Sequence, residues 1–464
     1  MSDERELLRR TAELAGDFVE SLDERRVFPD APVDELAAAL GGPLPEKPSD
    51  PLRVVEELAR AVEPGVVATA GGRYFGYVIG GALPATVGAD WLTTVWDQCA
   101  GLGALGPSAS VAEVIVGDWL KELLGLPSDA SFAITTGCQM AHVTALAAAR
   151  HDVLATRGWD VPRQGLAGSP PISVVVGALR HVTVDRALRL LGIGGDQLVV
   201  VAADDAGRMR PRALTAALAA SDGPTIVCAQ AGEVNTGSYD PFVEIVAIVR
   251  ETAAWLHVDG AFGLWAATSP TRRALLVGCA DADSWATDGH KWLNVPYDCG
   301  FAFCRKPDAH RASMTMSAAY FEGQGKWVRD AADWTPESSR RARAFTVYAA
   351  LRSLGREGVA ELVDRCCDLA QRFASAIAEL PGCTVLNDVV VNQVLVRFTP
   401  SDGGDGDAFT RAVMTRVQDE GEAWMGGTTW QGRPAIRVSV SSWRTTEADI
   451  DRTVAAFEAA LVVA

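Results

Sequence analysis

The amino-acid sequence predicts an α/β protein with a mostly parallel, doubly wound sheet and a smaller C-terminal α+β domain. Between about residues 110 and 305, short apolar runs bounded by turn residues alternate with helical patterns. Continuous apolar runs of this kind are typical of parallel strands that helices cover on both faces. Beyond about residue 345 the order changes to a long helix, two strands and a final helix, which indicates a second, smaller layered unit.

Length and composition agree with two or three structural units in a soluble protein. The chain has 464 residues, 48% of them hydrophobic, and no apolar stretch reaches the roughly 18 residues that a membrane-spanning helix needs. Its formal net charge of -17 would repel nucleic-acid phosphates and anionic lipids, so neither is expected as a partner. Nine cysteines without a Cys-x-x-Cys pair indicate reduced thiols, no metal site and a cytoplasmic location.

We divide the chain into a helical arm (residues 1–60), a large α/β domain (61–345) and a small α+β domain (346–464). In the arm, apolar residues at helical spacing from Leu7 to Leu22 predict an amphipathic helix, and a second helical pattern passes through Val54 and Leu58. The strands predicted for the large domain are 131–136, 173–176, 198–202, 225–229, 255–258 and 301–304. In the small domain we predict a helix over 359–380, strands over 393–398 and 435–440, and a last helix from Thr446.

The first candidate for chemistry is a lysine late in the large domain. The run from Ser284 to Trp292 follows a predicted strand and places Lys291 between His290 and Trp292. Desolvation and nearby positive charge lower the pKa of an amine, and a lysine that forms a Schiff base needs such a setting. Taken alone, the tripeptide is more often an ordinary surface lysine.

A carboxylate ends an earlier apolar strand. Asp259 follows the strand predicted over 255–258, and the small residue Ala261 comes two positions later. Ligands of an open parallel sheet bind beyond the carboxyl ends of its strands. A carboxylate there would hold a pyridine nitrogen protonated, and Ala261 would let a flat ring approach the backbone. The alternative for Asp259 alone is a helix cap or a turn.

Three more polar elements follow predicted strands. Gly137, Cys138 and Gln139 lie where a strand turns into a helix, and such a junction binds phosphate through its free N–H groups. His181 begins another helix, where an imidazole would stack on a ring and act as an acid or base. Asn235 would donate to a ring hydroxyl. Each has a structural alternative, but together the five elements predict a site for one aromatic phosphate.

In their order along the chain and in their residues, these motifs resemble those of the group II pyridoxal-phosphate decarboxylases. That family belongs to fold type I, the aspartate-aminotransferase class. The resemblance runs from about residue 64 to residue 352 and more loosely to the C-terminus. By motif, Lys291 resembles the lysine that carries pyridoxal 5'-phosphate, Asp259 the partner of the ring nitrogen and His181 the ring-stacking imidazole. The other implied cofactor contacts are Cys138, Gln139 and His290 at the phosphate, and Asp288, which falls where many members have asparagine.

The resemblance also implies a homodimer, because family members have the active site at the dimer interface. The segment 73–77 resembles the stretch that lines the partner's pocket, although the usual His-Pro before it is Gly-Gly here. Tyr74 and Phe75 in that segment are therefore implied substrate-binding residues. Arg352, in the basic region after the family's mobile catalytic loop, is another.

One departure concerns that mobile loop. Family members carry a tyrosine there that returns a proton to the substrate after CO2 leaves, and residues 321–335 contain none. Alignment on Trp334 places Ala331 at the expected position, and Tyr320 lies just before the loop. The fold and the cofactor stay as predicted, while the product is left open among amine, aldehyde and keto acid.

The leading interpretation is an L-amino acid decarboxylase, in which the substrate amine displaces Lys291 and CO2 departs into the electron sink of the ring. The same site suits an aldehyde synthase, which decarboxylates oxidatively, or an aminotransferase in which Arg437 clamps a carboxylate. A catalytically silent regulatory homologue is the remaining alternative, and it would not need such a lysine. The amino acid is not identified: an aromatic pocket or plain packing explains Tyr74, Phe75, Tyr77 and Trp96.

Overall fold

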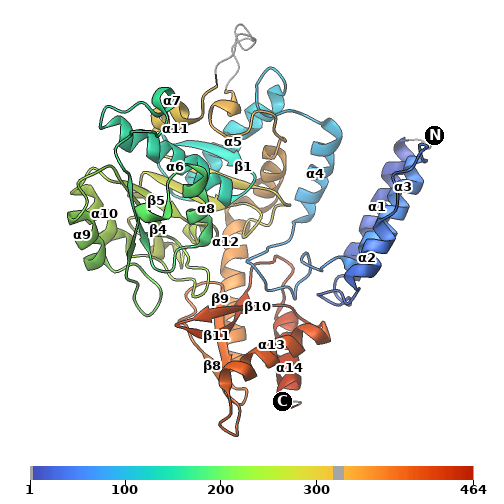
Figure 1. Ribbon diagram of the computed structural model, residues 1–464. Helices are drawn as coiled ribbons and strands as arrows, with labels where there is room; N and C mark the ends of the chain where they lie inside the picture. Colours follow the sequence, from blue (N-terminus) through green and yellow to red (C-terminus); the bar gives the residue numbers. More distant parts are fainter. Residues whose placement is uncertain (1–3, 317–328, 463–464) are drawn as a thin grey trace.

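The computed structural model describes residues 4–316 and 329–462, and its largest unit is a seven-stranded sheet (Figure 1). The strand order is β1-β7-β6-β5-β4-β2-β3. Only β7 runs antiparallel to its neighbours β1 and β6, so the predicted mostly parallel sheet is confirmed. The strands are β1 (Ser131–Thr135), β2 (Ser173–Gly177), β3 (Leu198–Val201), β4 (Thr225–Gln230), β5 (Trp255–Asp259), β6 (Ser284–Asp288) and β7 (Gly300–Cys304).

Helices cover both faces of this sheet, which explains why its strands are continuous apolar runs. Successive side chains of a strand point to opposite faces. In β2, Val174 and Val176 belong to one core cluster and Val175 to another. The first cluster includes side chains from α6 (Cys138–Ala155), α8 (Val182–Leu190) and α11 (Pro307–Met314). The second includes α5 (Pro107–Leu123), α9 (Pro211–Ala219), α10 (Phe242–Arg250) and α12 (Ala344–Ala378).

The C-terminal region forms its own antiparallel sheet in the order β10-β11-β9-β8. Strand β9 has the predicted bounds, whereas β8, β10 and α13 were not predicted. In β10 the sequence Gly-Gly-Thr-Thr-Trp has no alternating apolar pattern that would indicate a strand. The elements are β8 (Cys383–Val385), β9 (Gln393–Phe398), α13 (Gly406–Glu420), β10 (Gly426–Trp430), β11 (Arg433–Ser439) and α14 (Glu447–Val462).

Helix α12 joins the two sheets, and a kink at Gly355 (φ 62°) divides it. It begins 15 residues before the helix predicted over 359–380. It also crosses the predicted boundary between the large and small domains at residues 345 and 346, and this boundary stays a prediction. One strand assignment was wrong, because residues 284–288 form β6 itself instead of following a strand. Three polar residues in this short segment weaken its apolar pattern, although all five side chains are buried.

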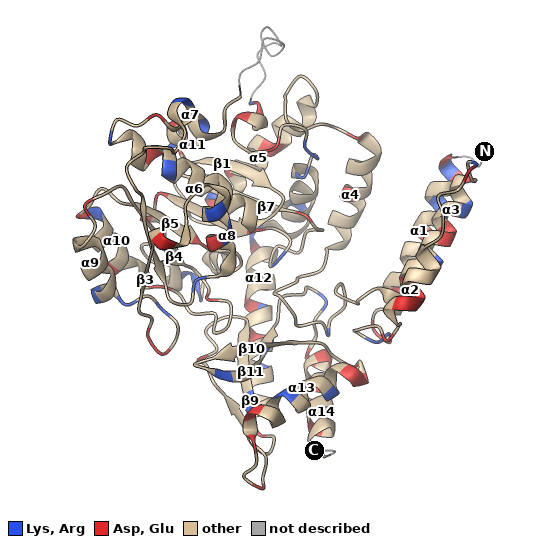
Figure 2. Cartoon of the chain, in the orientation of Figure 1, with Lys and Arg blue, Asp and Glu red and all other residues tan. Residues whose placement is uncertain are grey.

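The N-terminal arm stands to one side of the body (Figure 1). It consists of α1 (Glu4–Ser21), α2 (Val33–Leu40) and α3 (Pro51–Val62), and none of the described residues in these helices is buried. Acidic and basic residues interleave along α1 and α3 (Figure 2), and Arg10 pairs with Glu56 at 2.9 Å between the two helices. Helix α4 (Pro84–Trp96) and the short α7 (Val161–Gln164) complete the α-helices in the described part of the chain.

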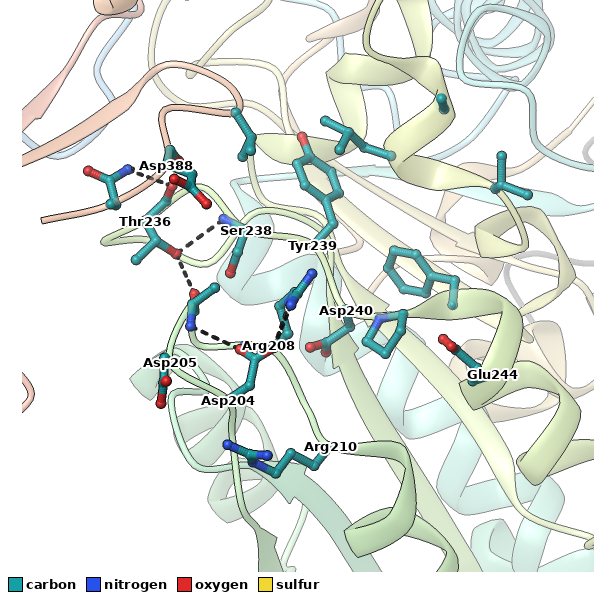
Figure 3. A pocket seen from close by; sticks show the side chains of 18 of the residues that line it. Asp204, Asp205, Arg208, Arg210, Thr236, Ser238, Tyr239, Asp240, Glu244 and Asp388 are labelled. Atoms are coloured by element: carbon teal, nitrogen blue, oxygen red, sulfur yellow. Dashed lines mark hydrogen bonds and ion pairs between the residues drawn. The ribbon is translucent and has the colours of Figure 1, made fainter. Parts of the chain in front are cut away.

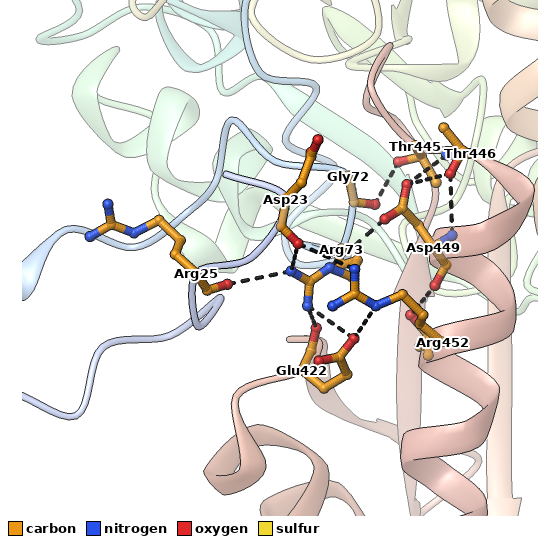
Figure 4. Close-up of polar contacts among 10 residues, drawn as sticks. Asp23, Arg25, Gly72, Arg73, Glu422, Thr445, Thr446, Asp449 and Arg452 are labelled. Atoms are coloured by element: carbon orange, nitrogen blue, oxygen red, sulfur yellow. Dashed lines mark hydrogen bonds and ion pairs between the residues drawn. The ribbon is translucent and has the colours of Figure 1, made fainter. Parts of the chain in front are cut away.

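A buried arginine ties the arm to the C-terminal region (Figure 4). Arg73 is 3% exposed and donates to the carbonyl oxygen of Asp23 at 2.7 Å. Its guanidinium also forms ion pairs with Glu422 at 3.2 Å and Asp449 at 3.8 Å. These contacts therefore fix the position of the chain where it leaves the arm. Within the described ranges, no helix is both long and apolar enough to cross a bilayer.

Candidate active site

The backbone of Lys291 is held firmly just after β6. A Cβ atom at Gly80 would come within 2.1 Å of the Lys291 carbonyl oxygen, so the segment before α4 packs against it as only glycine allows. Asn294 Nδ2 donates to the same oxygen at 3.2 Å. The lysine side chain is 18% exposed, and its Nζ lies 3.3 Å from Asp288 Oδ2. The amine therefore projects from a fixed position beside a carboxylate.

Asp259 ends β5 and is 5% exposed. Its Oδ1 accepts the backbone N–H of Ala261 at 3.1 Å and lies 3.5 Å from His142 Nε2. Burial favours the neutral acid, but the charges of His142, His181 and Lys291 and the contact with His142 outweigh it. They hold the pKa of Asp259 below its ordinary value. The group at the end of β5 is therefore a carboxylate at neutral pH.

His181 caps the N-terminus of α8, as its position after β2 predicts. Its Nδ1 lies 2.8 Å from Thr183 Oγ1 and accepts the Thr183 backbone N–H at 3.4 Å. Burial is the main cause that lowers the pKa of His181, and the charge of Lys291 adds to it while that of Asp259 opposes it. The ring is therefore neutral at pH 7 and, because Nδ1 accepts the Thr183 N–H, its proton lies on Nε2.

The junction of β1 and α6 has the features of an anion site. Gly137 adopts φ 148°, and a Cβ there would come within 3.0 Å of the His290 ring. Cys138 donates its backbone N–H to Asp288 Oδ1 at 2.5 Å. Within the described residues, the backbone N–H of Gln139 has no partner, and its buried Oε1 has none either. Free N–H groups at a helix N-terminus bind phosphate, so these residues fit the phosphate of the expected cofactor.

Asp288 links the anion site to the lysine. It is 3% exposed; its Oδ2 faces Lys291, and its Oδ1 lies 3.4 Å from His290 Nε2. His290 Nδ1 accepts the backbone N–H of Cys299 at 3.1 Å, so the ring proton lies on Nε2 and points at the carboxylate. The N–H groups of Cys138 and His290 and the amine of Lys291 thus offset the negative charge of Asp288. Many family members have an uncharged asparagine at this position.

Asn235 and Arg437 lie on the side of the small sheet. The Asn235 side chain donates to Glu233 Oε1 at 2.7 Å, and its oxygen accepts from Thr428 Oγ1 at 2.8 Å. Arg437 is half-buried on β11; burial lowers its pKa, while the charge of Glu233 opposes the shift. Ala261 packs against a small cluster of alanines under the site.

The three remaining predicted residues have different surroundings. Tyr74 is 6% exposed and stacks on Trp424 with ring centres 5.0 Å apart, while Phe75 is buried in the main core. Arg352 is exposed on α12 and lines a hollow with Trp119, near the end of α5 that leads into the amino end of β1. The amino ends of the parallel strands lie at the edge of the sheet opposite to their carboxyl ends, and the other predicted site residues gather at the carboxyl ends. Within one chain, Arg352 is therefore not part of the site.

Comparison with known proteins decides the family. The pyridoxal-dependent decarboxylase conserved domain matches residues 34–399. The chain belongs to this family. It is a carboxy-lyase that acts on an amino acid with pyridoxal phosphate as cofactor, as the sequence motifs predicted.

Relatives resemble the decarboxylase over nearly its whole length. The aromatic-L-amino-acid decarboxylase of Bacillus atrophaeus is 26% identical over 452 residues, which are 95% of this chain and 92% of the relative. The 4-hydroxyphenylacetaldehyde synthase of Rhodiola rosea is 28% identical over 376 residues, or 76% of this chain and 74% of the relative. The crystal structure of Oryza sativa TDC with PLP and tryptamine superposes with a TM-score of 0.93 at 22% identity, covering 99% and 98% of the two chains. The decarboxylase therefore has fold type I.

Sequence reasoning missed two histidines of the decarboxylase. His142 and His257 are fully buried behind Asp259, and their rings are joined at 2.9 Å. Helical spacing was an available signal, because His142 lies one turn after Cys138 on α6. In the described ranges, ligating atoms of Cys138, His142 and Asp259 lie within 4.8 Å of one another, as a metal ion would require. Hydrogen bonding accounts for this proximity, and the absence of a metal stays a prediction.

A separate acidic hollow of about 850 Å³ lies beside β4 and the small sheet (Figure 3). Two of its carboxylates, those of Asp204 and Asp240, are already partnered within the fold. Asp204 accepts from the backbone and side chain of Arg208, at 2.9 and 2.7 Å, and Asp240 accepts the backbone N–H groups of Met209 and Gln230. Burial raises the pKa of Asp240 to about 6. These groups brace local turns, and Lys291 does not line this hollow.

Proposed function

We propose that this decarboxylase acts on an aromatic L-amino acid, with Lys291 carrying the cofactor. The observation that supports the roles best is the convergence of a lysine amine, a buried carboxylate and a neutral imidazole on one edge of the sheet. Lys291, Asp259 and His181 are close enough for the charges of the first two to shift the pKa of the third. When bound, pyridoxal phosphate supplies the sink for the electron pair that CO2 leaves behind.

Each side chain has a defined task in this proposal. The Asp259 carboxylate keeps the ring nitrogen protonated, and neutral His181 stacks on the ring and moves a proton at Cα. The backbone and side chains of Gly137, Cys138, Gln139, Asp288 and His290 would hold the cofactor phosphate beside Lys291, while Ala261 would leave room for the ring. Asn235 would donate to the ring hydroxyl through the N–H that Glu233 leaves free, and Arg437 would pair with the substrate carboxylate.

The aromatic substrate is proposed from the rings that gather around Trp424, because two of them belong to the segment that leads into Gly80, which packs against the backbone of Lys291. Tyr74 and Tyr77 both stack on Trp424, with centres 5.0 and 5.7 Å apart. Tyr77 is 63% exposed and has φ 53°, a backbone conformation that costs of order 1 kcal/mol and often marks a functional position. The similar proteins named aromatic-L-amino-acid, tryptophan and tyrosine decarboxylases agree with such a substrate.

A screen of the twenty amino acids and common aromatic derivatives tests this proposal, with CO2, amine, aldehyde and hydrogen peroxide as readouts. We expect turnover with aromatic substrates. Tyr77→Ala is expected to raise KM by about fivefold, because an aromatic contact contributes roughly 1 kcal/mol. Tyr77→Phe keeps the ring and serves as the matched control with KM unchanged. Preference for an acidic or aliphatic substrate would contradict the aromatic assignment.

The missing loop tyrosine makes the product a separate question. Tyr320 lies outside the described residues, whereas Ala331 is 4% exposed in a short 3-10 helix. We expect Ala331→Tyr to shift the products toward simple amine, since a nearby acid speeds protonation at Cα over competing oxidation. Tyr320→Phe should leave the product mixture unchanged.

Ala331→Phe is the matched control, because it adds the same bulk at a buried position without the hydroxyl group. Amine, aldehyde and peroxide are measured for each variant. Amine alone from the wild type and all variants, at similar rates, would show that the absent tyrosine has no influence on the product. The similarity to 4-hydroxyphenylacetaldehyde synthase makes the aldehyde a specific second candidate.

A homodimer is proposed from apolar side chains that one chain leaves uncovered. Val87, Trp91 and Val95 recur every four residues on α4 and are 38%, 40% and 61% exposed. Such a stripe on one helix face is typical of a protein interface.

We expect the protein to sediment at twice the 49.1 kDa mass of one chain. Trp91→Glu with Val95→Glu should give monomers without activity, whereas Val243→Glu, at an exposed valine of α10, should stay dimeric. An active wild-type monomer would contradict this proposal.

We also propose a cytoplasmic location and retain the division at residues 60 and 345. The nine cysteines are thiols, seven of them buried, as is usual in a reducing compartment. The amino-acid substrate is the small-molecule partner, and no nucleic-acid or membrane partner is proposed for a chain of net charge -17.

A further inference from the structure

A row of buried hydrogen bonds leads away from the back of Asp259. His142 Nε2 lies 3.5 Å from Asp259 Oδ1, and His142 Nδ1 lies 2.9 Å from His257 Nε2. His257 Nδ1 lies 2.9 Å from Ser284 Oγ, which accepts the Trp255 indole N–H at 2.8 Å. All five side chains are at most 5% exposed. We call this row the histidine relay; it connects α6 with β5 and β6.

Donor and acceptor chemistry gives the relay a direction. The indole N–H only donates, so Ser284 Oγ accepts at that end. Burial, assisted by His142, lowers the pKa of His257 to about 3, so its ring is neutral and carries one N–H. If Ser284 donates to Nδ1, that N–H lies on Nε2 and points at His142 Nδ1. His142 then carries its own N–H on Nε2, the atom beside Asp259.

The opposite direction is unfavourable. A His142 ring with its single N–H on Nδ1 would present a bare Nε2 to a buried carboxylate, so that two acceptors would face each other without a proton. The N–H of His142 is shared between Asp259 Oδ1 and Cys138 Sγ, which lies 3.4 Å away. Burial, with the charges of Asp288 and Asp259, raises the pKa of the Cys138 thiol, which therefore stays neutral. The carboxylate is the stronger acceptor of the two.

We propose that His142 is a positioning residue, which holds Asp259 ionised and oriented because the rest of the relay fixes its tautomer. Oδ1 receives the N–H groups of Ala261 and His142, whereas no described residue hydrogen-bonds to Oδ2. Oδ2 thus stays available for the ring nitrogen of the cofactor. This inference rests on the proposed role of Asp259. Among the described residues, the other charged or titratable groups that act on Asp259 are His181, Lys291, the relay residue His257 and the buried thiols of Cys138 and Cys228.

The test uses two measurements on the holoenzyme and the apoenzyme. The 15N chemical shift of ring-labelled pyridoxal phosphate reports protonation of the ring nitrogen, and titration of the apoenzyme gives the dissociation constant of the cofactor. His142→Leu is expected to weaken cofactor binding at least tenfold and to move the shift toward the unprotonated ring. Ser284→Ala, at the far end of the relay, should act in the same direction with a smaller effect.

Two further variants make the result specific. His142→Gln offers a side-chain N–H near the position of Nε2 and should recover most of the loss. Thr144→Val is the matched control, because this buried hydroxyl bonds only to Met140 within α6 and should leave both values unchanged. If His142→Leu fails to fold, Ser284→Ala and His142→Gln carry the comparison.

Wild-type values of both measurements for His142→Leu would overturn the relay. If that variant does not fold, wild-type values for Ser284→Ala would overturn it. Asp259→Asn, measured in parallel, separates this failure from failure of the proposed function. If Asp259→Asn alone changes the 15N shift, the relay is wrong and the role of Asp259 stands. If Asp259→Asn also leaves the shift unchanged, the proposed role of Asp259 itself is wrong.

Discussion

Lys291→Ala is expected to abolish decarboxylation and the covalent attachment of the cofactor. The amine is the group that the fold holds beside Asp288 at 3.3 Å, on a backbone fixed by Gly80 and Asn294. No neighbouring side chain can replace its nucleophilic nitrogen, so the loss should exceed a thousandfold, of the order seen when a covalent catalyst is removed. The cofactor should still bind weakly through the phosphate site at α6.

Borohydride reduction followed by peptide mapping checks this result. In the wild type, the label should be found on the peptide that contains Lys291, and the visible absorption of the bound cofactor should disappear. Lys306→Ala is the matched control, since this lysine pairs with Asp152 at 2.6 Å on the surface of α6. Labelling at another lysine, or unchanged absorption in Lys291→Ala, would refute the assignment.

Asp259→Asn is expected to fold and to bind the cofactor but to lose turnover by about a thousandfold. An amide cannot hold the ring nitrogen protonated, and losing a close charge pair in a buried site costs several kcal/mol of transition-state stabilisation. Asparagine is nearly isosteric and can still accept the N–H of Ala261. The change should therefore fall on kcat and leave KM nearly unchanged.

A half-buried carboxylate at the other end of the same strands provides the control. Asp283 precedes β6 and accepts the backbone N–H of Leu256 at 2.8 Å. Asp283→Asn should reduce stability without affecting kcat, which thermal unfolding and steady-state kinetics will separate. Near-normal turnover of Asp259→Asn would mean that this carboxylate has only a structural role.

Several members of the site were predictable because their signal is local. Gly137 and His181 follow apolar strands within a few residues and Asp259 ends one, and parallel strands bring such ends to one edge. Lys291 was found from its own short motif. The strand bounds were found for the same reason, since burial on both faces makes each strand a continuous apolar run. Where that run is interrupted, as in β6 and β10, the prediction failed.

Only the tertiary structure decided which distant residues meet. His142 and His257 are 115 positions apart, and Tyr74 stacks on Trp424 across most of the chain. Arg352 was expected at the substrate, but α12 carries it to the opposite edge in this chain. The sequence by itself determined the family, the cofactor and the residues at the strand ends, because short motifs encode them. The histidine relay and the aromatic cluster depend on strand order and helix packing, which no local pattern specifies.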